Sequence, residues 1–165
     1  MKNISVRTVA KLGLLLALAL ALGYFESLLP VSGIPGIKLG LSNTVLLYAL
    51  YLVDRRSAWV LMVLKVVLSG LLFGGVNAMI YSFAGGVLSL TAMILMKKIK
   101  SLSIIGVSIS GAVMHNVGQV LAACFMVSSA AVLSWLPVLL VSSVVTGTVT
   151  GVIAKYAFKW LEKSN

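Results

Sequence analysis

The chain has 165 residues, of which 61% are hydrophobic and 10% are charged, and its formal net charge is +10 at pH 7. A water-soluble domain usually carries about a quarter charged residues, and three acids, Glu26, Asp54 and Glu162, cannot cover a solvated surface. The composition therefore predicts an all-α integral membrane protein, with one domain over residues 1–165. It argues against nucleic-acid binding, which needs basic residues gathered on one solvated face.

Six apolar stretches come close to the roughly 17–25 residues that cross a bilayer. We predict transmembrane helices near 11–29, 39–53, 57–73, 76–96, 103–127 and 132–157. The second and third are short for a full span. Glycine, proline or charged residues separate the stretches, as expected at helix ends. The basic start before the first stretch is also typical of a signal peptide. Because five further apolar stretches follow, we expect that first helix to be retained.

In a six-helix arrangement, most of the basic residues fall on one side of the membrane. Eleven of the thirteen lie before the first helix, after the second, after the fourth or at the end of the sixth. Lysine and arginine accumulate in cytoplasmic loops, so we predict a multi-pass cell-membrane protein with both termini in the cytoplasm. The same pattern explains the net charge, because these residues meet anionic lipid headgroups.

Polar side chains within the predicted spans are candidates for function, because burying them in a membrane is costly. At a rise of about 1.5 Å per residue, they fall in the middle or outer half of the membrane. We predict that one outward-facing binding site is lined by Asn43, Lys65, Asn77, Tyr81, His115, Asn116 and Gln119. Pro35, Gly36 and Lys38 would belong to a lid over that site.

Two alternatives to this binding site remain open. The amide side chains could simply hydrogen-bond one another between helices, with no ligand. Lys65 could pair with Glu26, the only plausible counter-ion within the membrane, instead of holding an anionic ligand.

Catalytic and metal-binding patterns are missing from the sequence. It has no glycine-rich phosphate loop, no pair of carboxylates at one depth, and only one histidine and one cysteine, which cannot build a zinc site. A prenyl diphosphate synthase needs an aspartate-rich magnesium cluster, and Asp54 alone cannot supply it. We therefore expect no enzyme activity, no cofactor and no metal.

Three segments resemble a known family: GIKLGLSN at 36–43, FGGVNAMIYSFAGG at 73–86 and SGAVMHNVGQ at 110–119. They are similar to the Gx transporter family, which is also labelled heptaprenyl diphosphate synthase component I. That family in turn resembles the S components of energy-coupling factor (ECF) transporters, which are six-helix proteins that capture vitamins from outside the cell.

The resemblance implies a substrate-binding subunit of an importer that takes up a vitamin-like or other small organic molecule. Its implied partners are a membrane coupling protein, the T component, and a pair of ATPases. Ala17 and Ala21 match the small-residue pattern through which S components dock the T component. The alternative is a non-transport membrane accessory subunit for quinone or prenyl-lipid synthesis or for extracellular electron transfer.

Overall fold

The computed structural model describes residues 6–28 and 41–163, and all regular structure in these ranges is helical. In chain order the elements are α1 (Val6–Ser27), η1 (Leu41–Asn43), α2 (Thr44–Leu52), α3 (Arg55–Ser69), the π-helix η2 (Gly70–Gly74), α4 (Gly75–Met96), α5 (Ile104–Val127), η3 (Ala130–Trp135) and α6 (Leu136–Lys163). The all-α prediction is confirmed for this part of the chain.

Four described segments are long and apolar enough to cross a membrane: Thr8–Ser27, Arg55–Met96, Ile104–Val127 and Ala130–Trp160. A fifth apolar segment, Leu41–Leu52, is shorter. The chain is therefore a membrane-embedded helical protein. The number of long segments is four rather than six for two reasons. Helix α2 has only nine residues, and α3 continues through η2 into α4 as a single helical run of 42 residues.

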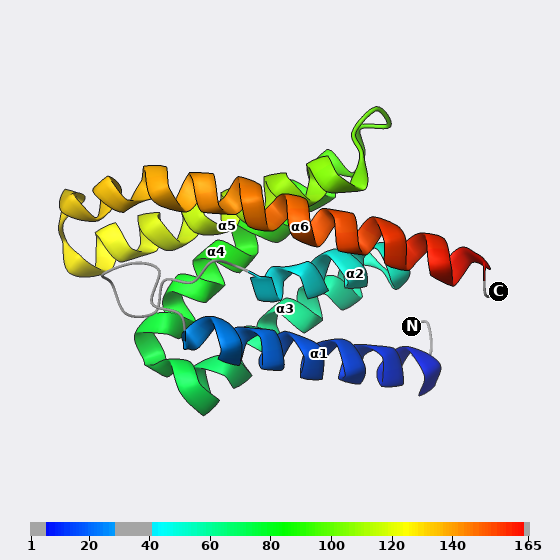
Figure 1. The fold of residues 1–165 in the computed structure, drawn as a ribbon. Helices are drawn as coiled ribbons and strands as arrows, with labels where there is room; N and C mark the ends of the chain where they lie inside the picture. Colours follow the sequence, from blue (N-terminus) through cyan, green and yellow to red (C-terminus); the bar gives the residue numbers. More distant parts are fainter. Residues whose placement is uncertain (1–5, 29–40, 164–165) are drawn as a thin grey trace.

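The run from α3 to α4 nevertheless reverses direction (Figure 1). The reversal follows the π-helix, where Gly75 has a φ of 72°. This backbone conformation is unfavourable for residues with a side chain but open to glycine. The break between the predicted helices at 57–73 and 76–96 therefore lies at Gly75, where the backbone leaves the helical conformation with no intervening loop.

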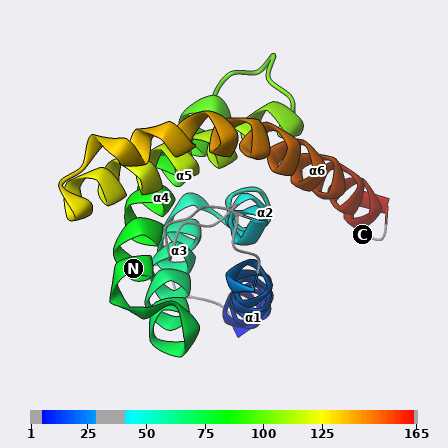
Figure 2. The same cartoon turned by 60° about the vertical axis from the view of Figure 1, so that its left-hand side comes forward.

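The described helices run back and forth between two ends of the bundle. Figure 1 places the α2–α3 junction, the α4–α5 connection and the end of α6 toward one end, and the α5–α6 connection at the other. Helix α2 lies between α1 and α6 in Figure 2 and also contacts α3 and α4. Five of its nine residues are at most 2% exposed: Val45, Leu46, Leu47, Ala49 and Leu50. A short helix is tolerated here because protein, rather than lipid, surrounds it.

Glycines allow α5 to approach its neighbours closely. A Cβ atom at Gly147 of α6 would lie 2.7 Å from the Cα of Ile109, and one at Gly151 would lie 2.8 Å from the Cα of Ile105. Such distances to backbone atoms leave no room for a side chain. The two glycines, four residues apart, therefore serve contact within this chain, as small residues do between membrane helices.

Charged residues fix the helix ends at the α2–α3 junction. The Asp54 side chain accepts a hydrogen bond of 2.7 Å from the backbone N–H of Ser57 and caps α3, as expected of an N-terminal aspartate. The Lys97 ammonium donates to the carbonyl oxygen of Leu50 at 2.7 Å and lies 4.2 Å from the ring centre of Tyr51. A cation thus interacts with the negative end of α2 and joins it to the end of α4.

Candidate functional site

Glu26, near the end of α1, binds the backbone where η1 begins. Its side chain is 3% exposed, and its two oxygens accept from the N–H groups of Leu41 at 2.6 Å and Ser42 at 3.1 Å. The first N–H groups of a helix have no partner within the helix, and a carboxylate satisfies them well. Glu26 therefore has a clear structural partner other than Lys65.

Lys65 of α3 reaches the last residue of η1. Its ammonium donates a hydrogen bond of 2.6 Å to the Oδ1 of Asn43, and both side chains are about 95% buried. Glu26 and Lys65 thus hold η1 from two sides, one through its backbone and the other through a side chain. Asn43 and Lys65, two of the predicted site residues, are therefore in direct contact.

Asn116 of α5 joins that helix to α6. Its Nδ2 donates to the Oγ of Ser143 at 2.7 Å and to the carbonyl oxygen of Leu139 at 3.1 Å, and the residue is completely buried. Further along the same interface, the Ser108 and Thr150 hydroxyls lie 2.9 Å apart. These contacts favour the structural alternative for Asn116, in which the amide holds two helices together.

His115 and Gln119 lie one turn apart on α5 and are 3% and 0% exposed. Helix α4 passes very close to His115, because a Cβ atom at Gly85 would lie 2.7 Å from both its Nδ1 and its carbonyl oxygen. The glycine in the 73–86 segment therefore accommodates the histidine of the 110–119 segment. Two of the three segments that carry the family resemblance thus meet at this contact.

Two further predicted site residues, both on α4, have different surroundings. Asn77 is exposed in the first turns of α4. Tyr81 is buried, but it belongs to an apolar cluster with Val120, Ala123, Val132 and Leu139. Its neighbours are those of a packing residue.

The other predicted residues can be placed only in part. Ala17 and Ala21 are exposed on α1, as a docking surface requires. The lid residues Pro35, Gly36 and Lys38 lie outside the described residues.

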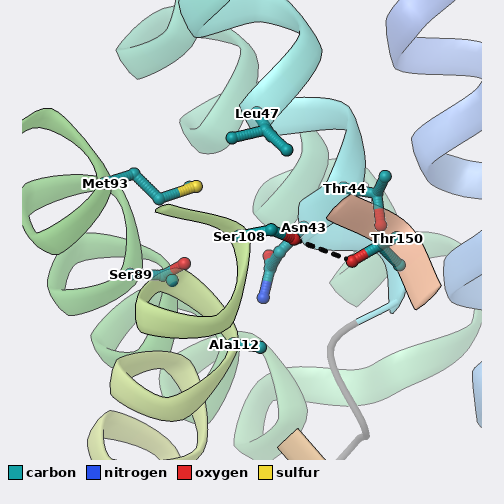
Figure 3. Close-up of a pocket in the computed structure, with 9 residues that line it drawn as sticks. Asn43, Thr44, Leu47, Ser89, Met93, Ser108, Ala112 and Thr150 are labelled. Carbon is teal, nitrogen blue, oxygen red and sulfur yellow. Dashed lines mark hydrogen bonds between the residues drawn. The ribbon is translucent and has the colours of Figure 1, made fainter. Parts of the chain in front are cut away.

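A small void lies where η1, α2, α4, α5 and α6 meet (Figure 3). It measures about 10 Å³ and has Asn43 among its lining residues. Sequence reasoning missed four polar residues that also line it: Thr44, Ser89, Ser108 and Thr150. Serine and threonine give little signal inside apolar helices, because their hydroxyls can bond to the preceding turn of their own helix.

The name polar cluster is used for six buried polar residues: Glu26, Asn43 and Lys65, which meet at η1, and His115, Asn116 and Gln119, which lie on α5. Among the described residues, no three histidine, cysteine, aspartate or glutamate side chains gather in a way that could hold a metal ion. The cluster offers one carboxylate, one ammonium, one imidazole and three amides. It can position helices and bind a polar group.

A family model described as heptaprenyl diphosphate synthase component I matches residues 15–157. This stretch covers most of the chain and includes all or part of every described helix. No curated protein and no solved structure matches the chain. The chain belongs to the heptaprenyl diphosphate synthase component I family.

Proposed function

We propose that this chain is a non-catalytic membrane subunit that works with partner proteins in prenyl-lipid or quinone synthesis. The observation that carries the proposal is the family match over residues 15–157, because the family is described as one component of a synthase. A component acts together with others. The membrane-embedded helices would place this subunit where prenyl lipids are made and used.

The buried polar groups support a binding or positioning role rather than catalysis. Glu26 and Asn116 are already engaged with backbone or side-chain partners. Glu26 and Asp54 also have separate structural roles, because Glu26 binds the start of η1 and Asp54 caps α3. Diphosphate chemistry would therefore reside in a partner that supplies a magnesium-binding aspartate cluster.

The proposal includes six membrane passages. The 42 residues of Arg55–Met96 would measure about 63 Å as one straight helix, twice the roughly 30 Å of a hydrocarbon core. Bending at Gly75 divides them into two passages. Helix α2, covered by protein, would provide the remaining one with the help of η1. The basic residues would then lie on the cytoplasmic side.

The docking surface for a soluble partner would be the basic end of the bundle. Arg55, Arg56, Lys98 and Lys100 are exposed there, and the nearby acid, Asp54, is engaged as a helix cap. An acidic patch on a partner enzyme would be attracted to this end and oriented by it.

Isolation of the tagged chain from its native membranes, followed by mass spectrometry, tests this proposal. We expect a prenyltransferase with an aspartate-rich motif to co-purify. The double variant Lys98→Glu, Lys100→Glu should weaken that association, whereas Lys98→Arg, Lys100→Arg should preserve it because the charge is kept. Recovery of the same proteins from wild type and from the charge-reversed variant would contradict docking at the basic end.

A second candidate function is the substrate-binding S component of an ECF importer, and a specific observation on α1 favours it. Ala17 and Ala21 are exposed one helical turn apart, and a Cβ atom at Gly13, one turn earlier, would meet nothing within 4 Å. Three small residues thus form an open strip along α1. Such a strip permits close approach of another helix, as docking to a T component would require.

The two functions predict different partners. If the chain is an S component, a membrane coupling protein and a pair of ATPases should co-purify with it, and Ala17→Trp with Ala21→Trp should abolish this association. Leu18→Trp serves as the matched control, because Leu18 is also exposed on α1 but lies outside the strip. Co-purification of a prenyltransferase that is unaffected by Ala17→Trp would favour the first function.

A further inference from the structure

Two buried polar groups next to the small void lack hydrogen-bond partners among the described residues. They are the Nδ2 of Asn43 and the Oγ of Ser89. Asn43 is 5% exposed and Ser89 is completely buried. An unsatisfied buried polar group costs about 1–3 kcal/mol, so two such groups beside one void call for an occupant.

The orientation of the Asn43 amide follows from Lys65. An ammonium group can only donate hydrogen bonds, and the ammonium of Lys65 lies 2.6 Å from the Oδ1. The Nδ2 must therefore be the other arm of the amide. Figure 3 shows the side chain of Asn43 reaching in among Ser89, Ser108 and Ala112 with the nitrogen at its tip.

The other hydroxyls around the void have partners. Thr44 donates to the carbonyl oxygen of Leu41 at 2.6 Å. The Thr150 hydroxyl lies 3.2 Å from the carbonyl oxygen of Gly147 and 2.9 Å from the Ser108 hydroxyl, and either hydroxyl can donate in this second contact. The Ser108 oxygen can still accept a hydrogen bond. An occupant of the void would thus meet a donor in Asn43, an acceptor in Ser108, and Ser89, which can be either.

Size and charge select the occupant. A void of about 10 Å³ is at the lower limit of about 10–15 Å³ that one water requires. The lining residues are uncharged: Asn43, Thr44, Leu47, Ser89, Met93, Ser108, Gly111, Ala112 and Thr150. A neutral molecule that both donates and accepts fits this site better than an ion.

We propose that the void is a binding site for one water molecule, which accepts a hydrogen bond from the Nδ2 of Asn43 and shares one with the Oγ of Ser89. This water extends the Lys65–Asn43 contact from α3 and η1 to α4. It joins the start of the short helix α2 to the middle of the bundle. The inference does not depend on the proposed function.

Hydroxyl-radical labelling by X-ray radiolysis tests this site, because a bound water generates radicals beside the residues that it touches. Met93 lines the void and is 2% exposed, whereas Met62 is 1% exposed and does not line it. We expect Met93 to be oxidised several-fold faster than Met62. In water enriched in oxygen-18, the label on Met93 should carry the heavy isotope.

A void-filling variant provides the control. Ser89→Val places two methyl groups where the hydroxyl was and should reduce Met93 oxidation to the rate of Met62, which itself should not change. If that variant does not fold, the comparison of Met93 with Met62 in the wild-type protein decides alone. Equal protection of the two methionines in wild type, or rapid Met93 oxidation that persists in a folded Ser89→Val protein, would overturn the proposal.

Discussion

The ammonium of Lys65 lies 2.6 Å from the Oδ1 of Asn43, 22 residues earlier in the chain. Both groups are buried, so this charge-assisted hydrogen bond is stronger than one at a solvated surface. It joins η1, which directly precedes the centrally placed helix α2, to α3. Removal of either side chain should therefore loosen the packing of α2.

We predict that Lys65→Met lowers the free energy of unfolding by about 1–3 kcal/mol, because the buried Oδ1 of Asn43 loses its donor. Lys98→Met, at an exposed position, should change it little. Thermal or SDS unfolding of the purified protein in detergent measures both. The double variant Lys65→Met, Asn43→Leu should recover part of the loss, because it removes both polar partners. No recovery, together with full rescue by Glu26→Gln, would show that Lys65 depends on Glu26 instead.

Glu26→Gln should selectively weaken the start of η1. A carboxylate accepts both N–H groups of Leu41 and Ser42, whereas an amide has one accepting oxygen and a nitrogen that donates. We expect faster hydrogen exchange at the amides of Leu41 and Ser42, with amides in the middle of α5 unchanged. Unaltered exchange at 41–42 would mean that the carboxylate does not hold this helix start.

The cap of α3 should make stability depend on pH. The hydrogen bond from the backbone N–H of Ser57 holds the pKa of the Asp54 carboxyl below its usual range. A lowered folded-state pKa contributes stability above the ordinary pKa near 4, and this contribution disappears as the pH falls through the folded value. Asp54→Ala should cost about 0.5–2 kcal/mol at pH 7.

Asp54→Asn keeps a side chain that can cap the helix but removes its negative charge. Asparagine also caps helices well, so at pH 7 this variant should stay close to wild type, but it should lose less stability between about pH 5 and pH 3. Thermal unfolding of both proteins across this range provides the measurement. Parallel pH profiles would rule out Asp54 as the titrating cap.

Gly147→Ala should destabilise the contact between α5 and α6. The new Cβ atom would lie 2.7 Å from the Cα of Ile109, and because backbone cannot rotate away, we expect a loss of about 1–3 kcal/mol. Gly13→Ala is the matched control, since nothing lies within 4 Å of its Cβ position. Alanine favours a helix interior over glycine by roughly 0.5–1 kcal/mol, so the control should be neutral or stabilising. Equal effects of the two substitutions would contradict close packing at Gly147.

Sequence reasoning predicted the helical class and most helix positions because long apolar runs between charged or glycine-rich breaks carry a strong signal. The predicted helix at 103–127 matches α5 to within one residue. The predicted helix at 132–157 is less accurate, because residues 130–135 form the 3-10 helix η3 and α6 extends from Leu136 to Lys163. Apolar content alone cannot distinguish a 3-10 turn from an α-helix.

The polar cluster was predictable in its members but only partly in its roles. A buried lysine or glutamate stands out in an apolar sequence, whereas its partner depends on three-dimensional arrangement. Glu26 binds backbone N–H groups. Every residue except proline has such a group, so the sequence does not indicate which ones a carboxylate will bind. Asn77 and Tyr81 share a helix face by spacing, yet Asn77 is exposed and Tyr81 packs among apolar residues. Their surroundings depend on neighbouring helices, which spacing does not specify.

The central claim is that this subunit supports prenyl-lipid synthesis at the membrane. Its most direct test is the amount of long-chain prenyl diphosphate made by membranes from cells that lack the chain, measured by mass spectrometry after radiolabelled precursor is supplied. We predict that product falls without the chain and returns when the wild-type chain is restored. Unchanged synthesis, accompanied by loss of uptake of a small molecule, would contradict the claim and identify the chain as an importer subunit.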